Sequence, residues 1–161
     1  MIAVADAGPL IAFARAKLLW LLEAVFDTLF VPEAVFHEVV RAGLDRVGAR
    51  EISAATWIRR QAVRHKALLD RLPSGLGPGE REAIALAHDL SILLLADDKK
   101  ARALARQEGV RVTGSLAVLL HAKQMSLIPA VRQPLELLVA SGYRISRHYA
   151  QLTLNAAGEQ E

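Results

Sequence analysis

The stretch ILLLADDKKARALARQEG, residues 92–109, decides the fold class of this sequence. Residues 92–96 are aliphatic without interruption, which is typical of a strand buried on both faces of a parallel sheet. Asp97 and Asp98 follow this strand directly, and residues 98–108 have the pattern of a helix. Because open α/β sheets bind ligands beyond the carboxyl ends of their strands, we expect Asp97 and Asp98 to lie at a ligand crevice.

The same alternation of strand and helix patterns runs through the whole chain. Short β patterns occupy residues 2–6, 27–32 and 110–115, and segment 55–63 is ambiguous between a strand and a helix end. Helical patterns occupy residues 9–23, 32–42, 79–90, 115–124, 131–140 and 146–154. Since parallel strands need crossover helices, the pattern predicts one α/β domain over residues 1–161, a three-layer α/β/α sandwich with a central, mostly parallel sheet. We expect the C-terminal helices, from about residue 129, to pack on the same domain.

Composition excludes several classes of protein and site. With 53% hydrophobic and 23% charged residues among 161, the chain is expected to fold rather than to remain disordered. It has no apolar run approaching the roughly 18 residues of a membrane span and no signal-peptide pattern, so a soluble, cytoplasmic protein is expected. The absence of cysteine excludes disulfides, thiolate nucleophiles and cysteine-based zinc sites. A net charge of +3 is compatible with a polyanionic partner.

Acidic residues recur at positions where a ligand site is expected. Asp6 follows the first strand as Asp97 and Asp98 follow the later one. In helix 32–42, Glu38 lies at the border of the apolar stripe, and in helix 79–90 Glu80 falls within the stripe. A structural alternative stays open for each aspartate, because a helix N-cap also favours aspartate and contributes about 1 kcal/mol. Two successive aspartates are more than one cap requires.

Converging carboxylates repel one another and take up protons unless a cation is present. Mg²⁺ or Mn²⁺ binds oxygen ligands and needs neither cysteine nor histidine. The five histidines show no zinc-binding spacing. The pattern therefore favours a magnesium or manganese site over a zinc site.

Five segments together resemble one family. They are VADAGPLIAFARAKLLWLL (4–22), VPEAVFHEVV (31–40), LGPGEREAIALA (76–87), LLLADDKKARALARQEG (93–109) and VTGSLAVLLHAK (112–123). In this order they resemble the PIN domain, in the branch related to VapC-type toxins, and the resemblance extends to about residue 145. It implies a metal-dependent ribonuclease with a parallel sheet and an acidic site.

The resemblance assigns roles to individual acids. It implies Asp6, Glu38, Glu80 and Asp98 as the successive acids, with Asp97 beside the last. Glu80 and Asp98 lie 18 positions apart, as the family's third and fourth acids do, which favours Glu80 over Glu82. Asp6, Glu80 and Asp98 would hold one or two Mg²⁺ or Mn²⁺ ions, and Glu38 and Asp97 would bind or orient water. The sequence departs from the family at Ala7-Gly8, where many relatives carry a hydroxyl.

The implied reaction is hydrolysis of phosphodiester bonds in single-stranded RNA. Lys99, Lys100 and Arg102 follow the acids and are candidates for binding the RNA backbone, although a solvated helix face explains such a run equally well. A toxin with an antitoxin partner is the implied role. The alternative function is a non-catalytic PIN-like nucleic-acid-binding or regulatory module. The apolar segment 10–26 has more hydrophobic surface than one sheet face buries, so we expect a homodimer unless the C-terminal helices cover it.

Overall fold

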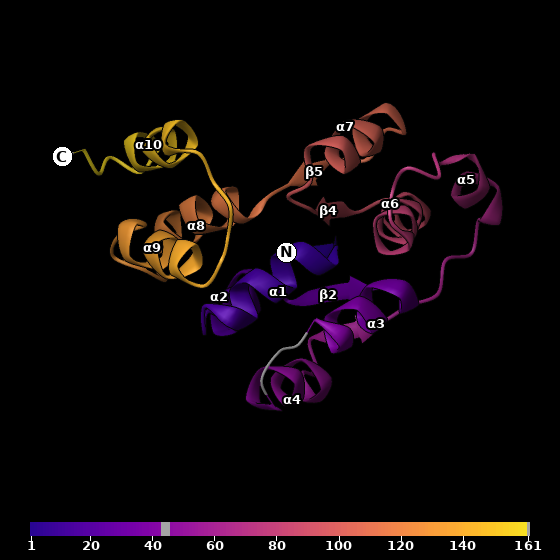
Figure 1. Ribbon diagram of the computed structural model, residues 1–161, viewed down its shortest axis with the longest axis horizontal. Helices are drawn as coiled ribbons and strands as arrows, with labels where there is room; N and C mark the ends of the chain where they lie inside the picture. The colour runs from indigo at the N-terminus through magenta and orange to yellow at the C-terminus, as the bar shows by residue number, and fades with distance from the viewer. Residues whose placement is uncertain (43–45, 161) are drawn as a thin grey trace.

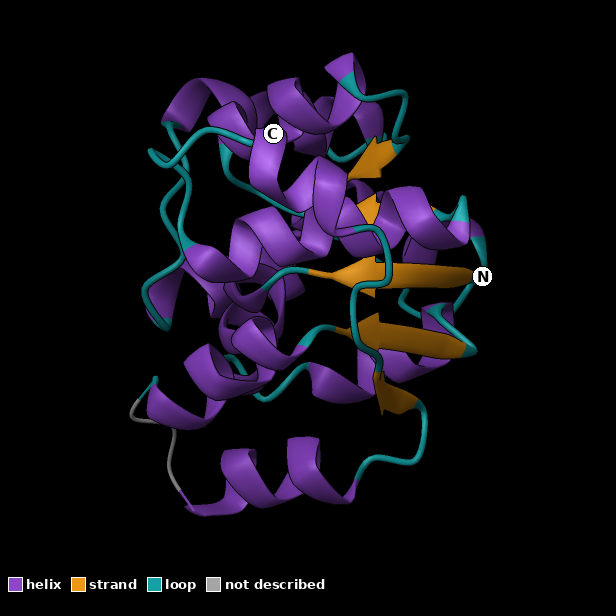
Figure 2. Cartoon of the chain, turned by 90° about the vertical axis from the view of Figure 1, so that its right-hand side faces the viewer, coloured by secondary structure: helices purple, strands orange, loops and turns teal. Residues whose placement is uncertain are grey.

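The computed structural model describes residues 1–42 and 46–160. In this part of the chain a five-stranded sheet has the order β3-β2-β1-β4-β5, and every neighbouring pair is parallel. The strands are β1 (Ile2–Ala5), β2 (Thr28–Val31), β3 (Ile58–Arg60), β4 (Leu93–Leu95) and β5 (Val112–Thr113). Helices flank the sheet on both sides (Figures 1 and 2), which confirms the predicted α/β sandwich.

The helices within the described residues follow the strands in the expected alternation. They are α1 (Ala7–Arg15), α2 (Leu19–Val25), α3 (Glu33–Arg41), α4 (Arg46–Ala54), α5 (Lys66–Arg71), α6 (Pro78–Leu90), α7 (Lys99–Gln107), α8 (Ser115–Gln124), α9 (Arg132–Ala140) and α10 (Arg147–Ala156). Helix α6 packs against β1 and β4 and contacts α3, α5 and α7, while α8 and α9 contact α2 and α1. None of the helices described is long and apolar enough to span a bilayer.

The order of the strands creates the crevice that the sequence predicts. From β1 the chain continues to β2 on one side, and β4 pairs with β1 on the other side. The register places Ala5 opposite Leu95, and the backbone N–H of Asp6 donates to the carbonyl of Leu95 at 2.9 Å. The residues that follow β1 and β4 therefore lie at the same sheet edge, at the switch point where such folds place their ligands.

The expected helix over residues 9–23 is instead two helices. Helix α1 ends at Arg15, Lys17 has a left-handed φ of 59°, and the N–H of Leu18 donates to the carbonyl of Phe13 at 2.8 Å. This hydrogen bond across the helix end is that of a Schellman-type cap, which usually has glycine at the left-handed position. The chain turns here because Leu18, like Leu19 and Leu22, is buried in the core.

Helices of the same chain cover the apolar surface that motivated the homodimer. Of the large apolar residues in segment 10–26, only Trp20 is exposed, at 50%, and the others are buried or half-buried. Helix α9 packs on α1, as the intramolecular alternative expects, whereas α2 is contacted by α8 and α10 packs on α8. The ambiguous segment 55–63 contains the edge strand β3, and helices α4 and α5 were not anticipated.

Candidate functional site

Asp6 occupies the centre of the sheet edge, between the carboxyl end of β1 and the start of α1. It is the N-cap of α1, and its carboxylate accepts a hydrogen bond from the N–H of Ala7 at 2.8 Å. Only 6% of the residue is exposed. Burial raises the pKa of Asp6 from 3.8 to about 7, opposed by the Ala7 hydrogen bond and reinforced by the nearby charges of Glu80, Glu38 and Asp98. Asp6 is thus both a helix cap and the buried member of an acidic cluster.

Asp98 reaches the same cluster from the loop after β4. It caps α7, with its carboxylate accepting from the N–H of Ala101 at 2.8 Å. Its charge raises the pKa values of both Asp6 and Glu80. Asp98 therefore both caps α7 and belongs to the acidic cluster. The capping alternative explains its hydrogen bond with Ala101 but not its proximity to Asp6 and Glu80.

Glu80 enters the cluster from the first turn of α6. Its Oε2 accepts from the N–H of Gly77 at 3.1 Å. The pKa of Glu80 is raised by partial burial first, then by the charges of Asp98 and Glu38, while the Gly77 hydrogen bond and the charge of Lys100 oppose the rise. The inward orientation expected from the helical phase agrees with this placement.

Glu82, the alternative third acid, has a different partner. Its Oε2 accepts from the N–H of Ala34 at 2.9 Å, in the first turn of α3. A carboxylate in that position satisfies a backbone donor that the helix leaves unpaired. Glu82 therefore joins α6 to α3, and Glu80 is the acid that the structure brings to Asp6.

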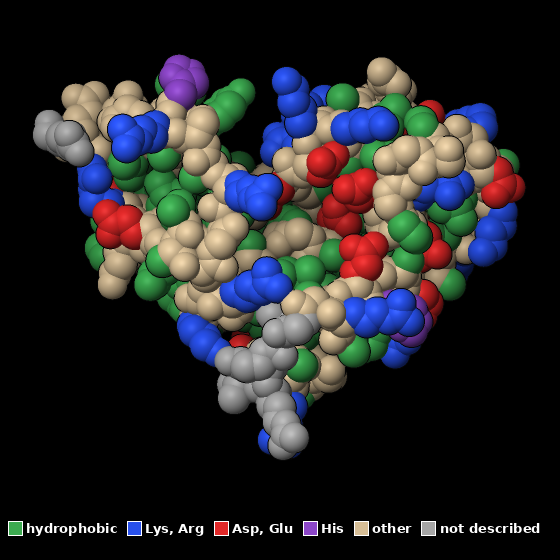
Figure 3. Space-filling view, in the orientation of Figure 1, with side chains coloured by type: hydrophobic (Ala, Val, Ile, Leu, Met, Phe, Trp, Pro, Cys, Tyr) green, Lys and Arg blue, Asp and Glu red, His purple; other side chains and the backbone are tan. Residues whose placement is uncertain are grey.

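Glu38 completes the cluster from α3. Its Oε1 accepts from the N–H of Gly79 at 3.0 Å. A Cβ atom added at Gly79 would lie 2.2 Å from that oxygen, so a side chain at position 79 would displace the Glu38 carboxylate from its present position. Asp6, Glu38, Glu80 and Asp98 thus come from four separate segments and lie close enough for their charges to interact. On the face of the molecule shown in Figure 3, Asp and Glu side chains gather in one area.

The fifth predicted acid, Asp97, is turned to a different part of the molecule. Its Oδ1 accepts from the N–H of Ser115 at 2.8 Å and its Oδ2 accepts from the Ser115 hydroxyl at 2.5 Å. Burial first, and the nearby charge of Asp97 next, raise the pKa of the Tyr143 hydroxyl, so Tyr143 lies close to this carboxylate. The structure therefore brings together four of the five expected acids and assigns the carboxylate of Asp97 to the start of α8.

The predicted basic residues lie beside the acids, on α7. Lys100 is close enough to Glu80 to affect its pKa, and an Arg102 Nη1 lies 3.5 Å from the carbonyl of Ala96. Lys99 and Arg102 line a pocket whose opposite wall contains Tyr143 and Tyr149. Sequence reasoning missed these tyrosines, although the run GYRISRHY at 142–149 combines basic and aromatic residues.

The donor chemistry of the cluster fits Mg²⁺ or Mn²⁺, since all four acids offer carboxylate oxygens. The raised pKa of Asp6 indicates negative charge that a cation would neutralise. As arranged, no three histidine, aspartate or glutamate side chains in residues 1–42 and 46–160 could hold a metal ion together. Glu38 and Glu80 each accept a backbone N–H bond through one oxygen, so each keeps a second oxygen that can bind a cation.

Comparison with known proteins assigns the chain to a family. The chain matches a family model described as a PIN domain over residues 2–159. The chain belongs to the PIN domain family, whose members are generally nucleases that use divalent metals. This confirms the resemblance in the sequence and identifies a nuclease-type module with a nucleic acid as its class of substrate.

A solved structure supports the fold. A PilT N-terminus domain protein from the hyperthermophilic archaeon Sulfolobus solfataricus P2 is similar to this chain, with a TM-score of 0.54 and 22% sequence identity. The similarity covers 92% of this chain and 99% of that protein. A search of curated proteins found no match. At this identity the likeness bears on the fold alone.

Proposed function

We propose that this protein is a metal-dependent endoribonuclease that hydrolyses phosphodiester bonds in single-stranded RNA. The observation that carries the proposal is the convergence of Asp6, Glu38, Glu80 and Asp98, whose charges act on one another at the carboxyl edge of the sheet. A carboxylate cluster of this kind has few uses in an apoprotein, because its mutual repulsion destabilises the fold. Cation binding would offset that repulsion.

Asp6, Glu80 and Asp98 would hold one or two Mg²⁺ or Mn²⁺ ions, which supply water activation and stabilise the charge that develops on the phosphate. Glu38 lies next to these acids and would orient the attacking water. In the reaction a water oxygen bonds to phosphorus, the bond from phosphorus to the leaving ribose oxygen breaks, and that oxygen takes up a proton. Lys99, Lys100 and Arg102 would bind the phosphates that a bare acidic site repels.

Asp97 has a supporting role in this proposal. Because both of its oxygens are bonded to Ser115, it would act on the reaction by fixing the loop that carries Asp98. This replaces the water-binding role expected from the sequence.

The proposed biological role is the toxin component of a toxin–antitoxin system, acting on cytoplasmic RNA. An antitoxin protein is the expected partner, and the resemblance to VapC-type toxins supports both assignments. A homodimer remains a prediction. The structural feature that supports a dimer is a depression of about 470 Å³ on the surface between α2 and α9, which the half-exposed Trp20 and Leu137 line.

A second candidate function is a non-catalytic PIN-like module that binds or regulates nucleic acid. Two observations favour it: Ala7 and Gly8 supply no hydroxyl beside Asp6, and the described carboxylates are not arranged to share a metal ion. Such a module would keep the acids as helix caps, as Asp6 and Asp98 are here.

The decisive experiment is an RNA cleavage assay with Mg²⁺ or Mn²⁺, with an Asp6→Asn variant and a chelator as controls. Metal-dependent cleavage that Asp6→Asn abolishes supports the nuclease. Calorimetric titration with Mn²⁺ separates the alternatives further, because a nuclease site should bind the ion at micromolar to millimolar concentration. RNA binding without cleavage or metal binding would establish the regulatory module instead.

A further inference from the structure

A pocket of about 650 Å³ lies immediately beside the acidic cluster. One wall is α7, the floor is the start of α8, and the opposite wall is the segment from Tyr143 to Tyr149 that leads into α10. In Figure 3 a notch separates the part of the molecule over α10 from the part over α7, with Lys and Arg side chains on its rim. The volume lies within the range of about 300–1,000 Å³ that small-molecule and cofactor sites have.

The pocket is cationic. Lys99, Arg102 and Arg106 line it from α7, and Arg144 faces them from the opposite wall. Asp97 is the acid among its described lining residues, and it is outnumbered by Lys99, Arg102, Arg106 and Arg144. The pocket therefore has a net positive charge that is available to an anionic ligand.

An aromatic ring stands at the mouth of this cationic surface. Tyr149 is 60% exposed, although it is a large side chain in the first turn of α10. Its backbone N–H donates to the Ser146 hydroxyl at 3.2 Å, which fixes the start of the helix, and its ring packs edge-on against His148 at 5.7 Å. One face of an exposed, positioned tyrosine ring offers a platform on which a planar base can stack.

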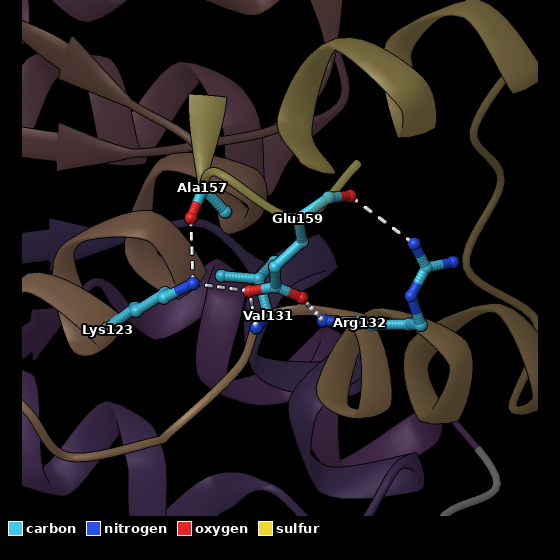
Figure 4. A network of polar contacts seen from close by, with 5 residues as sticks. All are labelled: Lys123, Val131, Arg132, Ala157 and Glu159. Atoms are coloured by element: carbon cyan, nitrogen blue, oxygen red, sulfur yellow. Dashed lines mark hydrogen bonds and ion pairs between the residues drawn. The ribbon is translucent and has the colours of Figure 1, made fainter. Parts of the chain in front are cut away.

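The wall that carries this ring is anchored at both ends. At its start, Tyr143 packs against the hydrophobic core and lies close to Asp97, which follows β4. Beyond α10, Glu159 accepts from Lys123 at 2.8 Å, from the N–H of Val131 at 2.6 Å and from the N–H of Arg132 at 2.9 Å (Figure 4). These contacts tie the C-terminal segment to α8 and α9, so the pocket is formed before a ligand binds.

We propose that this pocket binds a nucleotide of single-stranded RNA adjacent to the scissile phosphodiester, with its base stacked on Tyr149 and its phosphates at Arg102, Arg106 and Arg144. The proposal rests on the proposed function, which places the scissile bond at the acids. Continuity along the chain supports it, because Asp98 belongs to the cluster while its neighbours Asp97 and Lys99 line the pocket. Cationic residues with an exposed aromatic ring are the combination that binds single strands.

The first test measures binding without cleavage. A single-stranded hexanucleotide RNA containing 2-aminopurine is titrated with the full chain in the presence of a chelator, at several salt concentrations. Tyr149→Ala should weaken binding about 5- to 150-fold, the loss of one base-stacking contact, and should leave the salt dependence unchanged. Tyr149→Phe keeps the ring and should bind like the unaltered protein.

The charge is tested by a matched pair of arginine variants. Arg144→Ala removes one phosphate contact and should reduce the slope of log affinity against log salt by about 0.7. Arg111→Ala removes an exposed arginine that precedes β5, at the other end of the sheet, and should change neither affinity nor slope. Thermal melting of each variant confirms that the fold is intact.

Three results would overturn the proposal. The first is a Tyr149→Ala variant with unchanged RNA affinity and unchanged 2-aminopurine quenching. The second is RNA binding that Tyr149→Phe and Tyr149→Ala weaken equally. The third is an equal effect of Arg144→Ala and Arg111→Ala on RNA affinity and on its salt dependence. Competition by poly-glutamate as effective as that by RNA would identify a general polyanion site and would also overturn it.

A cleavage assay separates failure of the pocket from failure of the proposed function. If the protein cleaves RNA, Tyr149→Ala should raise KM with little change in kcat, whereas Asp98→Asn should abolish kcat. Cleavage that Tyr149→Ala leaves unaffected in KM removes the pocket alone. Absence of cleavage with either metal removes the nuclease, while the chelated binding assay still decides whether RNA occupies the pocket.

Discussion

Replacing Asp6 by asparagine should stabilise the metal-free protein at alkaline pH. Asp6 is 6% exposed, and its pKa in the folded state is about 7, against an ordinary value of 3.8. The folded state therefore binds a proton over a pH range in which the unfolded chain has released it. Stability contributed by this proton is present below about pH 4 and is lost as the pH rises through 7.

The magnitude follows from the two pKa values. Between pH 5 and pH 8 the linkage relation gives a loss of about 2–3 kcal/mol in the free energy of unfolding of the unaltered protein. Asp6→Asn removes this dependence and keeps an oxygen that can accept from the N–H of Ala7. The buried amide of asparagine costs about 1–3 kcal/mol of stability where its N–H groups lack partners. This cost is the same at both pH values, so the change in stability with pH reports on Asp6 more clearly than the stability at one pH.

The assay is guanidinium unfolding of both proteins at pH 5 and pH 8 in the presence of a chelator. The unaltered protein should lose about 2–3 kcal/mol more than Asp6→Asn between the two values. Glu159 does not confound this window, because its pKa is held at about 2 and its contribution is lost only under acidic conditions. Equal pH dependence in the two proteins, or stability of the unaltered protein that rises with pH, would refute the reasoning.

The remaining predictions use the same purified protein. Gly79→Ala should displace Glu38 and abolish cleavage, whereas Gly8→Ala, at the equivalent helical position in α1 and with open space around its Cβ, should leave cleavage unchanged. Asp98→Asn should leave the melting temperature of the apoprotein unchanged or raised while abolishing cleavage, because asparagine also caps helices; a loss of several kcal/mol would support a purely structural role. Glu159→Gln should lower the melting temperature at neutral pH by weakening charge-assisted hydrogen bonds, and the difference should shrink as the pH falls below about 4.5. Sedimentation should show a mass above that of the 17.5 kDa chain if the homodimer forms, and a single species of that mass would exclude it.

Much of the fold and the positions of four acids could be predicted from local patterns. The apolar run before Asp97 indicates a central strand, and strand ends in a parallel sheet share an edge, so Asp6 and Asp98 were expected at the same edge. The pairing of β1 with β4 makes them neighbours. Helical phase predicted the inward direction of Glu80 because its partners in the stripe are buried residues such as Ile84. These inferences need only periodicity and topology.

Features that depend on tertiary contacts could not be predicted in this way. The chain turns at Lys17 without the glycine that usually occupies the left-handed position of a helix cap. Burial of the leucines that follow determines this turn, so local sequence does not indicate it. Strand β3 consists of Ile58, Arg59 and Arg60. Two charged residues in so short a segment fit a strand at the edge of a sheet, which is where β3 lies. Tyr149 lies some 50 residues after Asp97, so only the folded chain brings it to the pocket.

The two successive aspartates have separate structural tasks, which explains why one would not suffice. Asp98 caps α7 and adds its charge to the acidic cluster, while Asp97 binds Ser115 at the start of α8 and lies close to Tyr143 on the wall of the pocket. The end of β4 is therefore the junction between the proposed cleavage site and the proposed nucleotide pocket. A strand of RNA bound across this junction would have its scissile phosphate at Asp98 and the adjacent nucleotide in the pocket that Asp97 and Lys99 line. Small movements of this one loop would therefore change both binding and cleavage.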